Sequence, residues 1–588
     1  MAKKATMERV FQGIGVSPGV ARGKILVYML AEEAIPEYDV TAEQVPQEVA
    51  RFEQALFKTR EQLHELQQRI ATGIGSGAPS SILDVHMSIT EDPALIDPVT
   101  SGLYEKKKNV EHIFHNVAQK YVKTLAELPD EFLRERAIDV QDVTRRIMRN
   151  LLGREHRGLG NVPPGTIVVA HDLSPSDTSS LDRRNVVGFA TDVGSHTSHT
   201  AIVARSMNLP AVVGLHDVSQ HVRNGQSSIL DGYSGTLVVE PSEQTLYVYG
   251  QIEVKRRTLE DRLKELKDLP AQTLDGHHVT LSGNIELPED VPALLAVGAE
   301  GVGLFRTEFL YLNRRDFPSE EEQYEKYLQV ARMVKPHSVI IRTLDIGGDK
   351  FHSEEVTPAE INPFLGFRAI RFCLANPDIF TAQLRAILRA SAEGNAKIMY
   401  PMISGVTEVI QATEILHEVM SDLKKEGVPF DENIDVGAMI EVPSAALTAE
   451  MIAQEVDFLS IGTNDLIQYT MAVDRVNERV ANLYEPTHPA ILRLIRGVVE
   501  AAHNNNIWVG VCGEIAGEPL YVPLLVGMGV DELSLAATSL PRVKEVIRRM
   551  KLTEVQELAA ATLHATRSRE VLAMLNALIE RIDPDIVG

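Results

Sequence analysis

Short apolar runs alternate with longer amphipathic stretches along the second half of the chain. Eight of these runs have the length of β-strands, and a helical or irregular segment follows each one. The eight runs lie at 279–285, 301–307, 338–344, 396–401, 435–441, 458–463, 508–512 and 532–535. Eight strand–helix units in succession predict a (β/α)8 TIM barrel over residues 271–588.

The first half of the chain combines short strands with a long helical stretch. Apolar residues recur at helical spacing from about residue 41 to residue 152, for example at Val45, Val49 and Phe52. Strand-like runs lie at 13–28 before this stretch and at 165–170, 186–190, 211–214, 228–231 and 235–239 after it. We therefore predict an α/β domain of residues 1–40 and 153–242, into which an all-helical subdomain of residues 41–152 is inserted.

A charged stretch with a thin apolar stripe predicts a helical linker over residues 243–270. Such a helix is about 40 Å long and suits a connector between parts that move, although an ordinary surface helix fits the pattern equally well. The predicted fold class is therefore multidomain α/β, with a C-terminal barrel after the linker.

Composition limits the partners and the compartment. The 588 residues include 58 Lys and Arg against 82 Asp and Glu, a formal net charge of −24. This charge disfavours nucleic acid and anionic membranes as partners and favours a partner with a basic face. The two cysteines, Cys373 and Cys512, lie far apart, so we expect no disulfide framework and a reducing cytoplasm. We expect neither a signal peptide nor a membrane span, because no apolar run approaches the ~20 residues that a span needs.

A histidine surrounded by hydroxyl groups stands at the start of a predicted helix. Residues 194–200 read Gly-Ser-His-Thr-Ser-His-Thr and lead into an apolar stretch. Free backbone N–H groups at a helix start attract anions, hydroxyl groups add donors, and histidine is a nucleophile at neutral pH. The stretch therefore predicts that His199, on a loop between a strand and a helix, carries a phosphoryl group. The alternative is that Thr197 or Ser198 is an ordinary N-cap.

Polar residues gather at the ends of the predicted barrel strands, where barrels of this type place their chemistry. Arg306 and Arg342, with Arg475 further along, suit a small, highly charged anion, because guanidinium groups bind phosphate and carboxylate in a planar fork. Glu441 and Asp465 supply hard oxygen ligands that suit one Mg²⁺, with the remaining ligands from water and substrate.

The predicted strand ends also carry a cysteine and several further polar residues. Cys512 closes the seventh predicted strand, where a thiol can give or take a proton, although a lone cysteine is more often a small buried residue. We interpret Cys373, on an amphipathic helix, as a core residue. The other polar residues at strand ends are Asn284, Asp345, Asn464 and Glu514.

Taken in order, these segments resemble the enzyme I family of the bacterial phosphotransferase system over essentially the whole chain. The resemblance rests on the stretches 197–200, 204–206, 301–309, 342–350, 362–371, 441–443, 460–466, 472–475 and 512–514. No single stretch suffices, but their order and spacing are highly specific. The resemblance implies an enzyme that takes a phosphoryl group from phosphoenolpyruvate onto its own histidine and releases pyruvate.

The resemblance also implies roles for the matching residues. His199 would be the phosphorylated nucleophile, and Cys512 would protonate the enolate carbon as pyruvate leaves. The implied cofactor is Mg²⁺, held by Glu441 and Asp465. The residues implied in substrate binding are Arg306, Arg342, Asn464, Asp465 and Arg475, with Arg368 and Lys350 as secondary candidates.

The implied partner is HPr, a small carrier protein whose histidine would receive the phosphoryl group in the first step of sugar uptake or regulation. We expect the helical subdomain to dock it through 82–87 and 91–93, which combine apolar contacts with acidic flanks. His112 and His115 are interpreted as ordinary helix-face histidines. The histidine domain must then swing between substrate and carrier, and the barrel is expected to form a homodimer.

The chain departs from the commoner Gly-Gly-Arg-Thr-Ser-His form of the family motif, because Ser195 and His196 replace the second glycine and the arginine. His196 is therefore a rival acceptor, although only His199 has the Thr-Ser-His-Thr frame. The missing arginine removes a fixed positive charge beside the phosphohistidine, and His196 replaces that charge only when protonated.

Alternative functions share parts of this chemistry. A dikinase that makes or uses phosphoenolpyruvate with ATP needs a nucleotide-binding region, and no Gly-rich nucleotide loop stands in the sequence before the histidine. A regulatory phosphorelay without sugar transport has identical chemistry, and the sequence does not name the final acceptors. A scaffold without activity leaves the polar strand ends unexplained.

Overall fold

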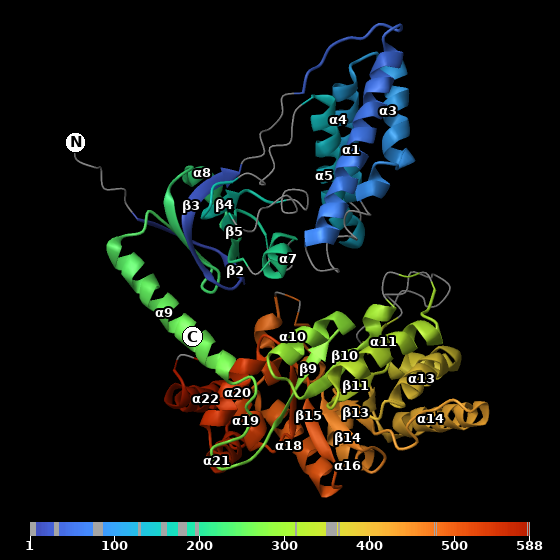
Figure 1. Ribbon diagram of the computed structural model, residues 1–588, viewed down its shortest axis with the longest axis vertical. Coiled ribbons are helices and arrows are strands. Elements are labelled where there is room, and N and C mark those ends of the chain that lie inside the picture. Colours follow the sequence, from blue (N-terminus) through green and yellow to red (C-terminus); the bar gives the residue numbers. More distant parts are fainter. Residues whose placement is uncertain are drawn as a thin grey trace. The chain divides into compact units, whose positions relative to one another are not determined.

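The computed structural model divides the chain into two compact units, Met1–Glu253 and Val254–Gly588 (Figure 1). It describes residues 8–28, 35–73, 86–126, 131–153, 162–173, 185–194, 199–207, 209–311, 314, 316–347, 362, 365–475, 477, 479–584 and 586. Each unit has its own sheet and its own hydrophobic core, as expected of separate domains.

The first unit contains an eight-stranded sheet. In spatial order the strands are β1 (Arg9–Gln12), β8 (Thr236–Val239), β7 (Ser227–Asp231), β3 (Val20–Tyr28), β4 (Thr166–Ala170), β5 (Val186–Thr191), β6 (Ala211–Val213) and β2 (Ile14–Ser17). The strands β3, β4, β5 and β6 are parallel to one another. Every residue of β4 is buried, as expected of a central strand covered on both faces.

The strands predicted after the helical stretch are all present. The region 13–28, predicted as a turn and one strand, forms the two strands β2 and β3. Between them lies Gly19, whose φ of +134° is a backbone conformation that favours glycine. The strand β1 was not predicted. Two helices of this unit, α7 (His199–Ser206) and α8 (Val218–His221), follow β5 and β6.

Amphipathic helices form the inserted subdomain, as their apolar spacing predicted (Figure 1). The long helices that the structure describes are α1 (Val45–Gly73), α3 (Pro93–Lys106), α4 (Val110–Ala126) and α5 (Glu131–Leu151). Their apolar faces meet in one core, in which the rings of Phe52 and Phe114 lie 5.6 Å apart. Asp92 caps α3 by accepting a hydrogen bond from the Ala94 N–H at 2.9 Å, and Pro93 occupies the first helical position.

The second unit is the predicted barrel, closed by eight parallel strands. They are β9 (Thr280–Ile285), β10 (Gly301–Arg306), β11 (Ser338–Arg342), β12 (Ala396–Tyr400), β13 (Val436–Ile440), β14 (Phe458–Ile461), β15 (Trp508–Val511) and β16 (Glu532–Leu535). Each overlaps its predicted run, which confirms the predicted fold class. The hydrophobic runs were recognisable because both faces of a barrel strand are buried.

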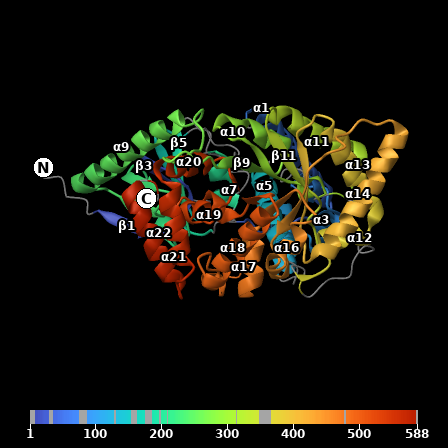
Figure 2. The same cartoon turned by 90° about the horizontal axis from the view of Figure 1, so that it is seen from below.

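Helices surround the barrel strands (Figure 2). They are α10 (Val291–Ala296), α11 (Glu320–Val334), α12 (Ile370–Ala375), α13 (Pro377–Ser391), α14 (Val406–Glu426), α15 (Pro443–Leu447), α16 (Ala449–Ile452), α17 (Thr463–Met471), α18 (Pro489–Asn504), α19 (Val522–Gly527), α20 (Leu540–Arg549), α21 (Leu552–Thr562) and α22 (Ser568–Ile582). Inside the strands, a separate cluster that includes Met399, Met439, Phe458 and Cys512 fills the barrel. The interior is therefore a packed core, and a functional site is expected at the ends of the strands.

The helix α9 (Glu243–Glu265) lies where a linker helix was predicted, and the boundary between the two units falls within it. In the first unit, Glu8 accepts a hydrogen bond from Thr245 Oγ1 at 2.7 Å. In the second unit, Arg262 Nε lies 2.9 Å from Glu545 Oε1 and also pairs with Asp583. The helix is thus anchored at each end to a different unit.

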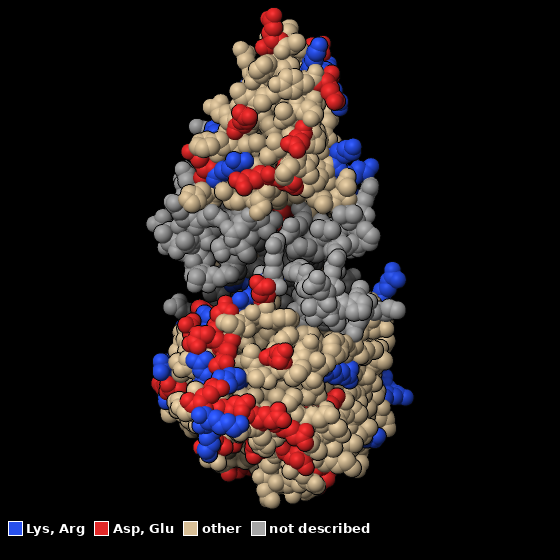
Figure 3. Space-filling view, turned by 90° about the vertical axis from the view of Figure 1, so that its right-hand side faces the viewer, with Lys and Arg blue, Asp and Glu red and all other residues tan. Residues whose placement is uncertain are grey.

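Acidic and basic side chains are interspersed on the face drawn in Figure 3. Among the helices that the structure describes, none is long and apolar enough to cross a lipid bilayer.

Candidate active site at the carboxyl ends of the barrel strands

A cavity of about 420 Å³ opens where several barrel strands end. Asn284 and Glu286 reach it from the end of β9, Arg306 from the end of β10, Asn464 from the start of α17, and Cys512 from just after β15. The Asn284 amide donates to the Cys512 carbonyl at 3.3 Å across 228 residues of sequence. Parallel strands of a closed barrel end at one edge, so the fold brings these predicted residues together.

Two arginines at this edge are held by exposed carboxylates. Arg306 Nη1 lies 3.1 Å from Glu286 Oε1, and Arg475 Nη1 lies 2.6 Å from Glu514 Oε1. Asn464 positions Glu514, because its side-chain oxygen accepts from the Glu514 N–H at 2.9 Å and its amide donates to Glu514 Oε1 at 3.3 Å. Three predicted site residues therefore share one polar edge with two carboxylates.

A buried chain of alternating charges lies at the ends of β10 and β11. Arg342 Nη2 donates to Glu308, and Arg342 Nη1 lies 3.0 Å from Asp345 Oδ2. The other oxygen of Asp345 accepts from Arg368 Nη2 at 2.7 Å. Burial disfavours the charged guanidinium of Arg342, but the carboxylates of Glu308 and Asp345 outweigh burial and raise its pKa. Both buried arginines therefore stay charged, which suits a permanent anion-binding surface.

Glu441 and Asp465 form the acidic part of the site. Glu441 is 2% exposed, and one of its oxygens accepts from the Met402 N–H at 2.7 Å. Burial raises the pKa of Glu441 to about 8, and the nearby carboxylates of Asp465 and Asp345 add to the effect. Burial also raises the pKa of Asp465, against the opposing charge of Arg368. This crowding of buried carboxylates is electrostatically unfavourable and is the kind of site that a divalent cation relieves.

Cys512 is 5% exposed and lies on the barrel side of the cavity. Its thiol donates weakly to the Ile461 carbonyl at 3.7 Å. Burial raises the pKa of the Cys512 thiol to about 11, and the nearby Glu441 contributes to the rise. The thiol is consequently protonated at neutral pH, which suits a proton donor and not a thiolate nucleophile.

Three of the remaining predicted residues are described only in part or not at all. His199 is the first residue of α7 and not a loop residue, and its side chain lies outside the described part of the chain, as do Lys350 and His196. The neighbouring Thr200 is buried and donates through Oγ1 to the Leu173 carbonyl at 3.4 Å.

Sequence reasoning named the arginines but missed two of their counter-ions, Glu286 and Glu308. Glu308 follows Arg306 by two residues and Glu286 follows the last residue of β9, so position at a strand end was the available signal. In the sequence alone, a carboxylate next to a predicted anion-binding site suggests repulsion of the anion. The structure explains its presence, because each carboxylate pairs with an arginine of the site.

In the helical subdomain, the predicted docking stretch 82–87 lies outside the described residues except for His86 and Met87. His86 is wholly buried, with Nε2 3.4 Å from Asp139 Oδ1, so its side chain serves packing within the subdomain. Of the acidic pair before Pro93, Asp92 is engaged as the cap of α3, and Glu91 is exposed.

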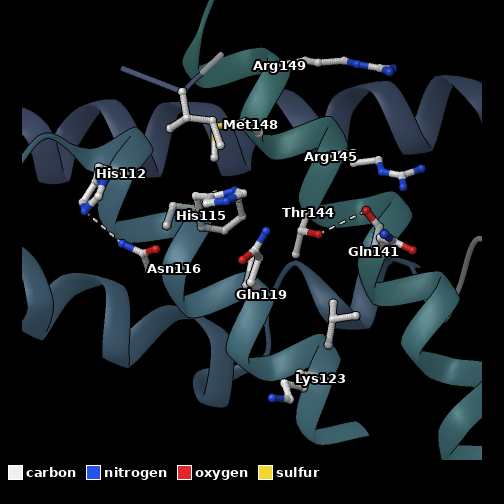
Figure 4. Close-up of a pocket in the computed structure, with 14 residues that line it drawn as sticks. His112, His115, Asn116, Gln119, Lys123, Gln141, Thr144, Arg145, Met148 and Arg149 are labelled. Carbon is white, nitrogen blue, oxygen red and sulfur yellow. Dashed lines mark hydrogen bonds between the residues drawn. The ribbon is translucent and has the colours of Figure 1, made fainter. Parts of the chain in front are cut away.

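A groove of about 910 Å³ lies between α4 and α5 (Figure 4). Its lining includes His115 and, as charged residues, Lys123, Arg145 and Arg149. Figure 4 shows Arg145 and Arg149 extending away from His115, so the basic groups do not converge on one point. The groove is basic and therefore differs from the acidic surface predicted for a basic carrier.

Comparison with known proteins identifies the family. Family models described as phosphoenolpyruvate-utilising enzyme match in three parts: the N-terminal domain over 12–136, the mobile domain over 162–235 and the PEP-binding domain over 260–552. A phosphoenolpyruvate-protein phosphotransferase of Priestia megaterium is 43% identical over 571 residues, covering 97% of this chain and 99% of that protein. One of Staphylococcus carnosus is 40% identical over 569 residues, with the same two coverages.

Among solved structures, an NMR structure of an enzyme I protein is 34% identical and covers 42% of this chain and 99% of that chain, with a TM-score of 0.38. The whole-length relatives carry the assignment, because they span both units and confirm the resemblance seen in the sequence. This chain belongs to the phosphoenolpyruvate-protein phosphotransferase family, the enzyme I family of the bacterial phosphotransferase system, and is a transferase of phosphoryl groups from phosphoenolpyruvate.

Proposed function

We propose that this chain phosphorylates itself on His199 from phosphoenolpyruvate, releases pyruvate and passes the phosphoryl group to a histidine of HPr, in the first step of sugar uptake or its regulation. The observation that carries the proposal is the meeting of fixed positive charge, crowded carboxylates and a protonated thiol at one edge of the barrel. Phosphoryl transfer needs mainly positioning and charge stabilisation, and enolate release needs a proton.

Arg306 and Arg475 are proposed as the first contacts of the substrate. Their side chains are 37% and 38% exposed, and their present partners, Glu286 and Glu514, are exposed as well. Ion pairs in water contribute little free energy, so the phosphate and carboxylate of the substrate can replace these partners at small cost.

Arg342 and Arg368 are proposed to bind the substrate from the buried side. Both are anchored by Asp345, which holds their forks in place before the substrate arrives. Asn464 adds an amide donor at the exposed edge. Lys350 is a secondary candidate through its match to the family motif alone.

Glu441 and Asp465 are proposed to hold Mg²⁺. Two carboxylates fit this ion, which commonly takes one or two protein carboxylates and completes its shell with water and substrate oxygens. When bound, Mg²⁺ neutralises charge on the transferring phosphoryl group.

Mg²⁺ should bind more tightly as the pH rises towards 8. The metal needs the ionised form of Glu441, whose pKa is raised to about 8, so below that pH a proton must leave on binding. Calorimetry without substrate should show an affinity that rises by about tenfold per pH unit between about 6 and 8 and then levels off. Glu441→Gln should remove both the tight binding of Mg²⁺ and the rise of its affinity with pH. If the affinity of this variant still rises with pH as in the wild type, Glu441 is not the metal ligand that titrates.

The proton is proposed to come from Cys512. Transfer breaks the bond between phosphorus and the enol oxygen and forms a bond between phosphorus and a ring nitrogen of His199. The enolate then takes a proton at its methylene carbon from the Cys512 thiol, and the thiolate regains a proton from solvent. A thiol that stays protonated at neutral pH suits this step.

Cys512→Ala should slow pyruvate formation by about 100- to 10,000-fold, the range for loss of a positioned acid. The rate is measured by coupling pyruvate to lactate dehydrogenase. Cys373→Ala is the matched control, since Cys373 is also a buried thiol but donates only to the Leu344 carbonyl at 3.9 Å. Equal losses in the two variants would show that a packing defect, and not proton donation, is responsible.

The experiment that tests the proposed function is incubation with phosphate-labelled phosphoenolpyruvate and Mg²⁺, without ATP, followed by mapping of the label under alkaline conditions that preserve phosphohistidine. Label on His199 that HPr removes supports the proposal. Label on His196 keeps the reaction but moves the acceptor, and labelling that requires ATP points to a dikinase.

Carrier docking is proposed on the inserted helices, with Glu91 as an exposed acidic contact. Because His199 and the barrel cavity belong to different units, transfer requires the units to approach and separate, with the linker helix α9 between them.

A homodimer through the barrel is also proposed. The large apolar side chains of Ile410, Leu447 and Met451 are exposed on α14, α15 and α16, and α16 packs against both of the other helices. Exposed apolar side chains grouped in this way are typical of protein interfaces.

A further inference from the structure

The side-chain amide of Asn284 joins three consecutive strands at the cavity edge of the barrel. Asn284 lies on β9, and its Nδ2 donates to the Cys512 carbonyl at 3.3 Å. Its Oδ1 accepts from the hydroxyl of Ser534, on β16, at 2.6 Å. Cys512 directly follows β15, and the sheet runs in the order β15, β16, β9. One side chain therefore ties the proposed proton donor to the two strands next to it.

The partners of the amide fix its direction. A backbone carbonyl only accepts hydrogen bonds, so the amide nitrogen of Asn284 must face Cys512, and the amide oxygen is left to the Ser534 hydroxyl. Asn284 and Cys512 line the cavity, whereas Ser534 is 3% exposed and is not among the described residues of its lining. Ser534 therefore orients the amide without reaching the cavity itself.

The backbone around Cys512 is held on both sides of this residue. Its N–H donates at 3.2 Å to the carbonyl of Ile461, on the neighbouring strand β14, and its carbonyl accepts from Asn284. The next residue is Gly513, where a Cβ would lie 1.8 Å from Thr463 Oγ1, so a larger residue does not fit without a shift. The peptide group that follows Cys512 is therefore restrained by both the Asn284 amide and the close approach of Thr463.

The position of the sulfur depends on this backbone. Cysteine has a single torsion between its backbone and its sulfur, so the orientation of the backbone and one staggered angle decide where the thiol points. The bond of the thiol itself, to the Ile461 carbonyl at 3.7 Å, is weak. A reacting group that is misplaced by about 1 Å can lose about 100-fold in rate. The bond from Asn284 therefore acts on the part of Cys512 that determines the reach of its thiol.

We propose that Asn284, oriented by Ser534, is a positioning residue that holds the Cys512 thiol against one face of the enolate. The proposal rests on the proposed function, because it requires Cys512 to be the proton donor. An enolate is planar, so its methylene carbon can take a proton on either face. In this step the π electrons of the enolate form the new C–H bond, the S–H electron pair stays on sulfur, and the ketone of pyruvate forms. A thiol held in one place adds the proton to one face only.

The chain offers a matched control in Asn395, at the opposite edge of the barrel. Asn395 directly precedes β12, whereas the cavity lies where the strands end. Its Nδ2 donates to the carbonyls of Ala331 at 2.9 Å and His337 at 2.7 Å. Like Asn284, it is half-buried and ties segments of backbone together, but it does so away from the proton donor.

The test compares the full-length wild type with Asn284→Ala, Ser534→Ala and Asn395→Ala. The substrate is phosphoenolpyruvate with one deuterium at a defined position on its methylene carbon. It reacts with Mg²⁺ in tritiated water for a single turnover, with the enzyme in excess. Lactate dehydrogenase traps the pyruvate at once, and the handedness of the methyl group, which now carries all three hydrogen isotopes, is determined together with the rate of pyruvate formation.

The wild type should give one handedness in large excess. Asn284→Ala should give nearly equal amounts of both, because an enolate that the thiol does not meet takes its proton from water on either face. Its pyruvate formation should slow by about 10- to 100-fold. Ser534→Ala, which keeps the amide but removes the bond that orients it, should lose part of the selectivity, and Asn395→Ala should match the wild type.

Handedness separates positioning from a merely structural role. A variant that is only less stable forms less pyruvate, but its folded molecules still add the proton to one face. A product of Asn284→Ala with the wild-type excess of one handedness therefore overturns the inference, as does a mixed product from Asn395→Ala. If Asn284→Ala does not fold, full selectivity in Ser534→Ala overturns it.

The outcomes for the wild type distinguish the inference from the function on which it rests. Equal amounts of both forms from the wild type would overturn the role of Cys512 as a fixed donor, and the inference with it. Wild-type protein that forms no pyruvate from phosphoenolpyruvate overturns the proposed function itself.

Discussion

Replacing His199 by glutamine should abolish phosphorylation from phosphoenolpyruvate while leaving phosphoenolpyruvate binding unchanged. Glutamine keeps a similar shape but has no nucleophilic ring nitrogen, so no bond to phosphorus can form. The loss should be complete in both half-reactions, the labelling of the enzyme and the transfer to the carrier. The barrel cavity belongs to the other unit, so its lining, which includes Arg306, is unchanged by the substitution.

Two measurements check this result. Label incorporation reports the first half-reaction, and calorimetric titration of the variant with phosphoenolpyruvate and Mg²⁺ reports binding. His196→Gln is the control, because it removes the neighbouring histidine of the same motif and should retain labelling. Persistent labelling of His199→Gln, or its loss in His196→Gln alone, contradicts the assignment of the acceptor.

Replacing Arg342 by methionine should both weaken the barrel and remove turnover. The side chain is 11% exposed and neutralises Glu308 and Asp345, so its loss leaves two buried carboxylates with less compensation. Breaking a buried ion pair from one side costs about 3–5 kcal/mol of unfolding free energy. The loss of one preorganised charged donor should also lower kcat by about 100- to 1,000-fold.

Unfolding in urea is followed by the fluorescence of Trp508, the only tryptophan of the sequence, which lies on β15 and reports on the barrel. Arg385→Met is the control. Arg385 also pairs with two carboxylates, Glu320 and Glu426, but at the surface of α11, α13 and α14, so its loss should cost about 1 kcal/mol or less. Equal destabilisation by the two substitutions would show that burial does not increase the contribution of the Arg342 ion pairs to the free energy of unfolding.

The barrel and its site could be predicted from the sequence to an unusual extent. Strands buried on both faces produce apolar runs that stand out from the amphipathic helices between them. Because all eight strands are parallel, a polar residue at the carboxyl end of any run falls at the same edge. This rule selected Arg306, Arg342 and Cys512 before any contact between them was known, and Arg306 and Cys512 do line one cavity.

Other features could not be predicted, because they depend on pairs of residues that are distant in sequence. Glu308 was not predicted as a site residue, because its role depends on its contact with Arg342, 34 residues later in the chain. His86 belonged to a stretch predicted as a docking surface, yet its ring is buried against α5. No periodicity distinguishes a histidine that faces a partner from one that faces its own core.

The sequence by itself determined the order of the domains along the chain, the positions of the polar residues at strand ends, and the histidine motif. Each of these depends on residues that are neighbours in the chain or that repeat with a fixed period. The tertiary structure alone decided which charges pair, how deeply Glu441 and Cys512 are buried and therefore in which direction their pKa values move. It also decided that Asn284 meets Cys512 and Ser534. Burial and pairing are properties of packed surroundings, and the packing of distant segments is what the fold adds to the sequence.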